Sequence, residues 1–293
     1  MTPQPFRFRL AYRPPFHWSA LRDFFALRGA SGVETVVDGV YGRCLRAGSH
    51  QGWITLEDEA SSSSIMVRAA PDLFSVKAEL QQGLRRMLDL DADIRAIESL
   101  LQADARLSPM LAQYPGLRVP GAWDGYEVAV RAIVGQQVSV KGATTVFSRL
   151  AEQFGEPLQT PITQLNRLPP LCERVAGASL ESVIGCGMNR ARAQALLDLS
   201  NAVARGWLRL QAGQEVAAVC KQLKSIRGIG DWTAQYIAMR VLRDADAFPA
   251  SDLGLMKAIG VQRPRELLNI AEAWRPYRAY AAIHLWRSPG AGG

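Results

Sequence analysis

The chain has 293 residues, enough for two ordinary domains or one large domain. With 48% hydrophobic and 21% charged residues it can form a packed core, which excludes a wholly disordered protein. Thirty-four Lys and Arg against 27 Asp and Glu give a net charge of +7, which suits a polyanionic partner but also serves solubility.

Membrane and metal-binding functions find no support in the sequence. No apolar run approaches the roughly 18 residues of a membrane span, and residues 1–16 lack the apolar stretch and cleavage site of a secretory signal. We therefore expect an intracellular protein with reduced thiols, no membrane contact and no cofactor. Its cysteines and histidines show neither a C-x-x-C pair nor metal-ligand spacing: Cys44, Cys172, Cys186, Cys220, His17, His50 and His284.

The first 87 residues combine strand and helix patterns. Phe6, Phe8 and Leu10 alternate with Arg7 and Arg9, which predicts a half-buried strand. This order of elements favours an antiparallel sheet covered by two helices, in an N-terminal mixed α/β domain of residues 1–87. Further strands are predicted at 33–37, 52–56 and 65–69, and helices at 19–28 and 73–88.

From residue 89 onward the strand patterns disappear and apolar residues recur with helical periodicity. Gly, Pro, Asn and Ser stand at plausible helix ends, and many of the connections are short. Residues 88–293 are therefore predicted to form an all-helical domain, which makes the fold class α+β. Helices are predicted at 91–103, 124–134, 139–154, 179–184, 189–205, 214–225, 231–243, 264–274 and 276–287.

Residues 223–234 (LKSIRGIGDWTA) lie between two predicted helices and contain the pattern Gly228-Ile229-Gly230. Two glycines around an apolar residue allow a tight hairpin whose backbone N–H groups, at the start of the next helix, are open to a phosphate. An ordinary helix–turn–helix connection would explain the glycines alone. The longer pattern over the whole stretch resembles the helix-hairpin-helix motif, which grips a DNA backbone without reading its sequence.

A second motif follows the hairpin. Residues 248–257 (FPASDLGLMK) form a Pro-containing loop that ends in Asp252. A hairpin followed by such a loop resembles the helix-hairpin-helix/Gly-Pro-Asp superfamily of DNA glycosylases. The resemblance extends from Pro14 to Trp286. Further stretches are similar to the AlkA-type branch, DNA-3-methyladenine glycosylase II: residues 31–36, 115–121, 130–139 and 274–280, and Trp286.

This resemblance implies a fold and a function. The sheet domain would precede a helix-hairpin-helix glycosylase core of two subdomains, residues 114–244 with the hairpin and residues 88–113 plus 245–293, with the active site between them. The implied protein is a monomeric, monofunctional DNA glycosylase of base excision repair, cytoplasmic and associated with the bacterial nucleoid. It would flip alkylated bases of the 3-methyladenine or 7-methylguanine type out of double-stranded DNA and hydrolyse their N-glycosidic bond, leaving an abasic site.

Three competing functions stay open. The first is a bifunctional glycosylase/AP lyase of the same superfamily, which would attack the sugar with a lysine on the helix after the hairpin. Two residues past Gly230 stands Trp232, and neither Lys224 nor Lys257 matches the lysine position, which favours the hydrolytic enzyme. The second is a non-catalytic protein that only uses the hairpin to bind DNA. The third is a small-molecule enzyme without a recognisable nucleotide fingerprint.

Asp252 is the candidate catalytic residue. Cleavage of an N-glycosidic bond builds positive charge on the sugar, and a nearby carboxylate can stabilise that charge or orient the attacking water. Asp252 could also cap the helix that starts at Leu253, and both roles can coexist. In the family an aromatic residue commonly follows the catalytic Asp, so Leu253 puts the range of accepted bases in question.

The candidate base pocket is aromatic. Trp232 and Tyr236 are spaced i, i+4 on the helix after the hairpin, away from its apolar stripe. There they could stack on a flipped base and attract a positively charged one. They could instead simply pack against another helix. The resemblance adds Trp286 and, from the N-terminal region, Phe24 to this pocket.

The resemblance also implies DNA contacts. Gln136 and Gln137 match the wedge that fills the hole left by a flipped base, although the family often has Leu at the second position. Residues 185–190 superficially resemble a second hairpin, but a simple turn with Asn189 as helix N-cap explains them better. The residues implied in backbone binding are Arg227, Gly228, Ile229, Gly230 and Thr233. In the family the hairpin also holds a monovalent cation through main-chain carbonyls, here those of Lys224, Ile226 and Ile229.

Overall fold

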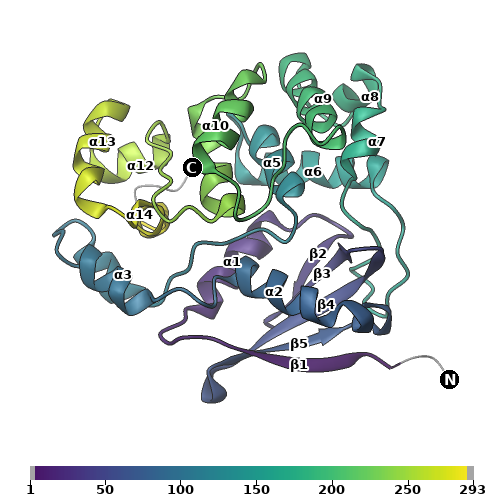
Figure 1. Cartoon of the computed structure of the whole chain (residues 1–293), viewed down its shortest axis with the longest axis horizontal. Helices are drawn as coiled ribbons and strands as arrows, with labels where there is room; N and C mark the ends of the chain where they lie inside the picture. Colours follow the sequence, from purple (N-terminus) through teal and green to yellow (C-terminus); the bar gives the residue numbers. More distant parts are fainter. Residues whose placement is uncertain (1–3, 289–293) are drawn as a thin grey trace.

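The computed structural model describes residues 4–288. Its N-terminal part is a five-stranded antiparallel sheet with the strand order β1-β5-β4-β3-β2 (Figure 1). Helices α1 (Trp18–Arg28) and α2 (Lys77–Leu88) pack against the sheet, which confirms the predicted arrangement. The strands are β1 (Phe6–Ala11), β2 (Glu34–Val37), β3 (Val40–Ala47), β4 (His50–Glu59) and β5 (Ser64–Ala69).

Edge and inner strands of the sheet differ in how clearly the sequence indicates them. On the edge strand β1, Phe8 and Leu10 are buried while Arg7 and Arg9 are exposed, so polar and apolar residues alternate. Strand β3, which the sequence analysis does not predict, lies between β2 and β4 and buries successive residues, including Arg43. A strand covered on both faces shows no alternation, and its pattern is therefore harder to recognise.

Residues 89–288 consist of helices and loops, with one isolated β-bridge between Pro157 and Arg167 and one from Leu165 to Gly32 of the N-terminal part. The predicted helices are present. The helix expected at 231–243 consists of α11 and a following π-helical turn at Ala238–Leu242. The short helices α4 and α7 are not predicted by the sequence. No described helix is long and apolar enough to cross a membrane. The helices are α3 (Ile94–Leu101), α4 (Ser108–Gln113), α5 (Gly125–Val134), α6 (Val140–Phe154), α7 (Cys172–Ala176), α8 (Leu180–Gly185), α9 (Arg190–Ala204), α10 (Val216–Ser225), α11 (Asp231–Ile237), α12 (Leu253–Ile259), α13 (Pro264–Ala271) and α14 (Arg278–Trp286).

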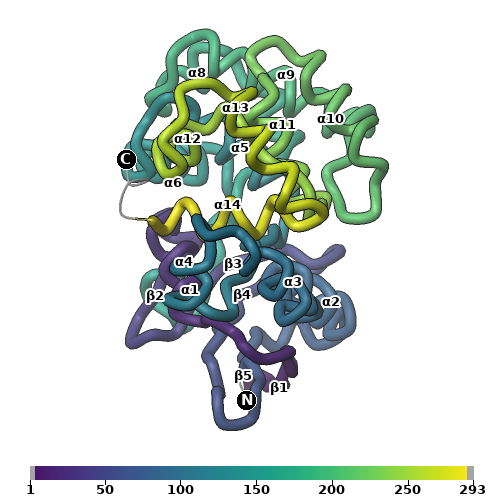
Figure 2. Tube along the Cα trace, turned by 90° about the vertical axis from the view of Figure 1, so that its left-hand side faces the viewer, coloured from purple at the N-terminus to yellow at the C-terminus, as the bar shows by residue number. Residues whose placement is uncertain are grey.

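The sheet lies at one end of the molecule and α8 to α10 at the other in both views (Figures 1 and 2). One hydrophobic cluster fills the space between the sheet, α1 and α2, and Leu165 and Leu168 from the α6–α7 loop also belong to it. A larger cluster joins the helices and includes Ala20 of α1. Buried side chains from both predicted helical subdomains share this cluster, so the subdomain boundaries stay a prediction.

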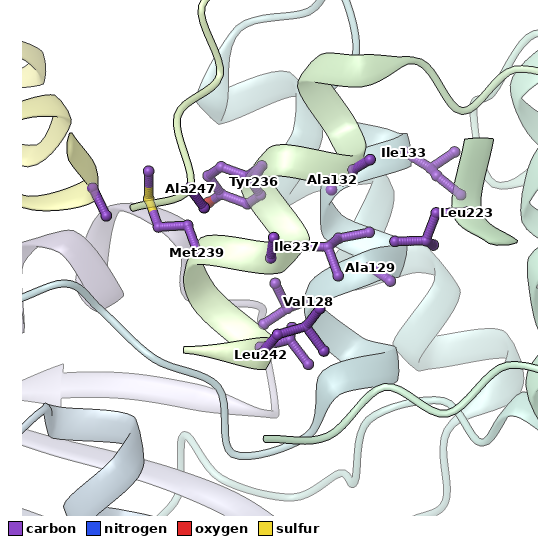
Figure 3. Close-up of a cluster of buried hydrophobic side chains, with 14 of the residues drawn as sticks. Val128, Ala129, Ala132, Ile133, Leu223, Tyr236, Ile237, Met239, Leu242 and Ala247 are labelled. Atoms are coloured by element: carbon purple, nitrogen blue, oxygen red, sulfur yellow. The ribbon is translucent and has the colours of Figure 1, made fainter. Parts of the chain in front are cut away.

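Helix α11, which follows the hairpin, is held by packing against α5. Ile237 of α11 lies beside Ala129, Ala132 and Ile133 of α5, and Leu223 of α10 completes the contact (Figure 3). These side chains are at most 2% exposed. The packing fixes the rotation of α11 and therefore the direction of its aromatic residues.

A buried ion-pair network ties the N-terminal part to α5. Arg43 on β3 lies 2.7 Å from Glu127, and Arg131 contacts both Glu127, at 2.8 Å, and Glu34. Burial alone would raise the pKa of Glu127, but the guanidinium groups of Arg43 and Arg131 outweigh it and hold the pKa below its ordinary value. Arg131 also donates to the backbone carbonyl of Arg28, so the network positions α1 relative to α5.

Candidate active site

The carboxylate of Asp252 lies where three helices meet. Asp252 is the N-cap of α12, and its Oδ1 accepts the backbone N–H of Leu255 at 2.9 Å. The indole N–H of Trp286 donates to the same oxygen at 3.0 Å, and the indole N–H of Trp232 donates to Oδ2 at 2.8 Å. The helix-capping interpretation is therefore correct, and it leaves the carboxylate in contact with both predicted tryptophans.

These donors determine what the carboxylate of Asp252 can do. Hydrogen bonds to both oxygens hold the carboxylate in one orientation. A hydrogen bond from an N–H group to a charged carboxylate is stronger than one between two neutral groups. Asp252 is nevertheless partly exposed, so a ligand can reach it. A fixed, accessible carboxylate is suited to stabilise positive charge that forms beside it.

Three of the predicted pocket aromatics form one cluster. The rings of Trp232 and Tyr236 stack with centroids 5.2 Å apart and an interplanar angle of 9°, and Trp286 meets Tyr236 edge-on at 6.2 Å. Both tryptophans are partly exposed, whereas Tyr236 is only 9% exposed. The prediction that both aromatics of α11 lie off the buried face is therefore wrong for Tyr236. Of the three, the tryptophans present the surface on which a base can stack.

Phe24 approaches this cluster from α1. The guanidinium carbon of Arg28 lies 3.8 Å from the Phe24 ring centroid, and that of Arg240 lies 4.9 Å from it. Arg240 also donates to the hydroxyl of Tyr236 and to the backbone carbonyl of Pro120, both at 2.8 Å. Phe24 is thus linked to Tyr236 through Arg240, and it is itself partly exposed, so its role as a direct pocket residue stays a prediction.

Sequence reasoning missed Arg28 and Arg240. Burial lowers the pKa of the Arg28 guanidinium. Burial alone would raise the pKa of Tyr236, but the guanidinium groups of Arg240 and Arg28 outweigh it and lower that pKa. Their spacing in the sequence could have indicated both arginines. Arg28 follows Phe24 by four positions and Arg240 follows Tyr236 by four, and residues with this spacing lie on one face of a helix.

The hairpin between α10 and α11 uses its two glycines differently. Gly228 has a φ of +94°, and a Cβ there would lie 3.0 Å from the Cβ of Ala195, so the turn itself requires glycine. Gly230 has a φ of −93°, and a Cβ there would meet nothing within 4 Å. Ile229 is buried and anchors the turn, while Arg227 is exposed. The glycine at 230 therefore leaves open surface at the start of α11, as a backbone-binding hairpin needs.

The carbonyls predicted to hold a monovalent cation belong to the same hairpin. The carbonyl of Ile226 accepts the N–H of Ile229 at 3.0 Å, which leaves it a second lone pair for another ligand. Main-chain carbonyls are neutral oxygen donors of the kind that binds monovalent cations. Among the described residues, His, Cys, Asp and Glu form no group that could hold a metal ion. The hairpin is compatible with the cation, which stays a prediction.

The two predicted wedge residues have different environments. The side-chain amide of Gln136 donates to the carbonyl of Gly228 and to the hydroxyl of Thr233, both at 3.0 Å. Thr233, expected among the DNA contacts, is only 2% exposed and serves this bond instead. Gln137 is exposed, with a φ of +56°. Gln137 therefore fits the wedge, whereas Gln136 ties the α5–α6 turn to the hairpin.

Residues 185–190 form the predicted simple turn. The side chain of Asn189 accepts the N–H of Arg192 at 2.9 Å and caps α9. The guanidinium of Arg192 donates to the carbonyls of Val134 and Gln136 at 3.1 and 3.3 Å. The start of α9, the α5–α6 turn and the hairpin are thereby joined into one unit.

Comparison with known proteins agrees with this geometry. Residues 7–124 match the AlkA N-terminal domain family, and residues 130–263 match the family of HhH-GPD superfamily base excision DNA repair proteins. DNA-3-methyladenine glycosylase 2 of Escherichia coli (strain K12) is 33% identical over 288 residues, which cover 97% of this chain and 98% of that protein.

Solved structures with the same fold include enzymes of different activities. A 3-methyladenine DNA-glycosylase from Archaeoglobus fulgidus matches with a TM-score of 0.82 at 20% identity, over 95% of this chain and 97% of that chain. The 8-oxoguanine glycosylase/lyase of Clostridium acetobutylicum, in complex with double-stranded DNA, matches with a TM-score of 0.75 at 16% identity, over 92% and 90% of the chains. The fold alone therefore does not separate hydrolytic from lyase members.

Proposed function

We propose a specific reaction for this chain, which belongs to the HhH-GPD superfamily of base excision DNA repair proteins and is a DNA glycosylase. The reaction is hydrolysis of the N-glycosidic bond of an alkylated base in duplex DNA, without strand cleavage. One observation carries it: two residues after Gly230 stands Trp232, whose N–H binds Asp252, where a lyase would need a lysine. The name of the similar E. coli protein supports 3-methyladenine as a substrate.

Asp252 acts on the sugar in this proposal. As the bond between C1′ and the base nitrogen breaks, its electron pair leaves with the base and positive charge forms on the sugar. The carboxylate, held by the N–H groups of Trp232 and Trp286, stabilises that charge until the oxygen of a water molecule bonds to C1′ and gives up one proton to the surrounding water. A base alkylated on a ring nitrogen already carries positive charge and leaves readily, so one carboxylate suffices.

The flipped base stacks on the partly exposed faces of Trp232 and Trp286. Their electron-rich rings favour a positively charged alkylated purine over a normal base. Tyr236 supports Trp232 from its buried side at 5.2 Å, and Phe24 and Arg240 support Tyr236 in turn. The two tryptophans therefore select the base, and the residues behind them keep the tryptophans in place.

The hairpin amides near Gly230 bind the DNA backbone without reading its sequence. Gln137 enters the duplex where the base leaves and recovers part of the unstacking energy. In this proposal the enzyme acts as a monomer on duplex DNA with alkylated bases. The predicted cation at the hairpin, held by the carbonyls of Lys224, Ile226 and Ile229, would supply a fixed positive charge beside the phosphate.

A bifunctional glycosylase/lyase is the second candidate, because a lyase shares the fold. An attacking amine would have to come from Lys224 or Lys257. Lys224 lies 3.3 Å from the carboxylate of Asp231 in an exposed ion pair, and Lys257 is exposed in the last turn of α12. Within residues 4–288 neither lysine forms a hydrogen bond or an ion pair with Asp252, which makes the lyase reaction less well supported.

Incubation of the protein with methylated duplex DNA, followed by chromatography of the released bases, tests the proposal. We expect release of 3-methyladenine and 7-methylguanine, with strands that stay intact until alkali treatment. Borohydride present during turnover should trap no protein–DNA adduct. A trapped adduct that disappears in Lys257→Arg or Lys224→Arg would overturn the hydrolytic assignment in favour of the lyase.

A further inference from the structure

An open groove of about 660 Å³ lies beside the hairpin. Its walls are the C-terminal half of α9, the loop between α9 and α10, and the first residues of the hairpin. We call it the tryptophan groove, after the exposed indole at its edge. Its lining includes Asn201, Arg205, Trp207, Ile226 and Arg227, none of which belongs to the site around Asp252.

Trp207 is held in its exposed position by the surrounding backbone. It is 50% exposed, whereas the next residue, Leu208, is 1% exposed. The carbonyl of Trp207 accepts the side-chain amide of Gln222 at 2.9 Å, and the N–H of Leu208 donates to the carbonyl of Ala202 at 3.0 Å. The indole of Trp207 is therefore held at the surface, where a ligand can pack against it.

The charges of the groove favour an anion. Arg205 and Arg227 are exposed, and within the part of the chain that the structure describes neither forms an ion pair. Asp198 is the acidic residue of the lining, and its Oδ1 accepts the side-chain amide of Gln194 at 2.9 Å. Two arginines thus border the groove against one carboxylate. Guanidinium groups beside an exposed aromatic ring are the combination with which proteins hold nucleic-acid backbones and bases.

The groove is continuous with the hairpin. Ile226 and Arg227 line the groove and also form the first half of the turn that leads to Gly230. A DNA strand whose phosphate lies on the hairpin amides can therefore continue into the groove without leaving the protein surface. Both contacts would be independent of base sequence, because they involve phosphates and sugars.

We propose that the tryptophan groove is a second DNA-binding site, which takes the sugar–phosphate backbone of the hairpin-bound strand beyond the hairpin. Arg205 and Arg227 contact successive phosphates, and the indole of Trp207 packs against a sugar between them. This inference rests on the proposed DNA contact of the hairpin. It extends the footprint of the enzyme to one side of the lesion.

Binding of abasic-analogue duplexes of different length tests the groove. The double variant Arg205→Ala/Trp207→Ala is compared with wild type on one long duplex and on two duplexes shortened to either side of the lesion, by fluorescence anisotropy. We expect the double variant to bind the long duplex about tenfold more weakly than wild type. The slope of log affinity against log salt concentration should fall by about one, because one phosphate contact is lost. On one shortened duplex the two proteins should bind equally, because the strand no longer reaches the groove.

The control variant Arg265→Ala/Leu268→Ala removes an exposed arginine and an exposed leucine from α13. It should bind all three duplexes like wild type. Thermal melts check that all variants are folded. With Arg205 kept, Trp207→Ala should lose part of the affinity for the long duplex, whereas Trp207→Phe, which keeps an aromatic ring, should retain most of it. A loss in Trp207→Ala distinguishes the groove from a general effect of surface charge, because this variant leaves the charge unchanged.

If wild type and Arg205→Ala/Trp207→Ala bound every duplex equally, the proposal that DNA binds in the groove would be overturned. An equal loss of affinity on all three duplexes would also overturn it, because the loss would then not depend on whether the DNA is long enough to enter the groove. Excision of methylated bases by wild type is measured in parallel. The proposed function is tested by base release and by borohydride trapping with wild type, neither of which depends on the groove, so the two failures are separate.

Discussion

In the hairpin the surface offered to a ligand is backbone: Gly228 sets the turn, and Gly230 leaves the start of α11 open. Around Asp252 the surface is made of side chains, with Trp232 and Trp286 brought to one carboxylate by helices far apart in the sequence. The first region depends on one short stretch of chain, and the second depends on the packing of α11, α12 and α14. Changes that loosen this packing should therefore harm base excision before they harm DNA binding.

The largest effect is expected for Asp252→Asn. Asparagine also caps helices well, so α12 should persist. However, the amide nitrogen must face an indole N–H, and the negative charge beside the sugar is lost. Excision should fall by about 10²–10⁴-fold while binding of abasic-analogue duplex stays near wild type. Single-turnover release of 3-methyladenine measures the first, and anisotropy the second. A parallel loss of binding would contradict the separation of the two regions.

Acid should weaken the packing of α14 through His284. This side chain is 1% exposed, and burial lowers its pKa to about 4, below the ordinary value of 6.5. Below pH 6.5 the unfolded chain takes up a proton that the folded chain does not, so stability should fall by about 3 kcal/mol between pH 6.5 and 4. Urea unfolding at several pH values measures this slope.

In His284→Gln the free energy of unfolding should no longer contain the pH dependence that comes from this histidine. This holds even if the substitution changes the stability at pH 7.5. Because Trp286 lies on the same helix as His284, wild type at pH 5.5 should lose excision of 3-methyladenine earlier than duplex binding. An unchanged pH slope in the variant would mean that other groups cause the acid sensitivity.

A smaller effect is expected for Trp232→Phe and Trp286→Phe. Each keeps an aromatic ring and removes one N–H donor to Asp252, a charge-assisted bond worth about 1.5–3 kcal/mol. Excision should drop about 10- to 100-fold with little change in binding. The matched control is Trp123→Phe, because Trp123 is also partly exposed and its indole N–H donates at 2.8 Å to the carbonyl of Arg46 in the sheet. Equal activity losses in all three variants would indicate general destabilisation.

The smallest effect is expected in the hairpin, with Gly230→Ala. Its methyl group would meet nothing in the protein, so the thermal melt should be unchanged. It should obstruct the phosphate and weaken binding of all duplexes about tenfold, independent of sequence. Gly228→Ala is the counterpart, because its φ of +94° should cost about 1–2 kcal/mol of stability. If Gly230→Ala bound DNA as tightly as wild type, the exposed main chain at Gly230 would not be the part of the protein that contacts the DNA phosphate.

The same contrast explains what the sequence predicts well. The hairpin and the Asn189 turn are local, because glycine and cap residues act on their immediate neighbours. As a helix cap, Asp252 is identifiable for a similar reason, whereas its catalytic role comes from the resemblance of its loop to the glycosylase superfamily and stays a prediction. Strand β1 is visible through its alternation.

Other features depend on partners that no local pattern indicates. Tyr236 is buried because Trp232 covers one face and Arg240 binds its hydroxyl. Gln136 and Gln137 are adjacent and identical in type, yet only the first finds an acceptor on the hairpin. Such differences arise when helices distant in the sequence pack together, and helical periodicity alone does not show which residue faces which partner.

A repair enzyme meets many undamaged base pairs for each damaged one. Because Gln136 ties the α5–α6 turn to Gly228 and Thr233, the exposed side chain of Gln137 keeps a fixed offset from the open surface at Gly230. If the hairpin holds the phosphates as proposed, every one-nucleotide step along the duplex would carry Gln137 to the next base pair. Travel along DNA and inspection of the base stack would then be a single movement.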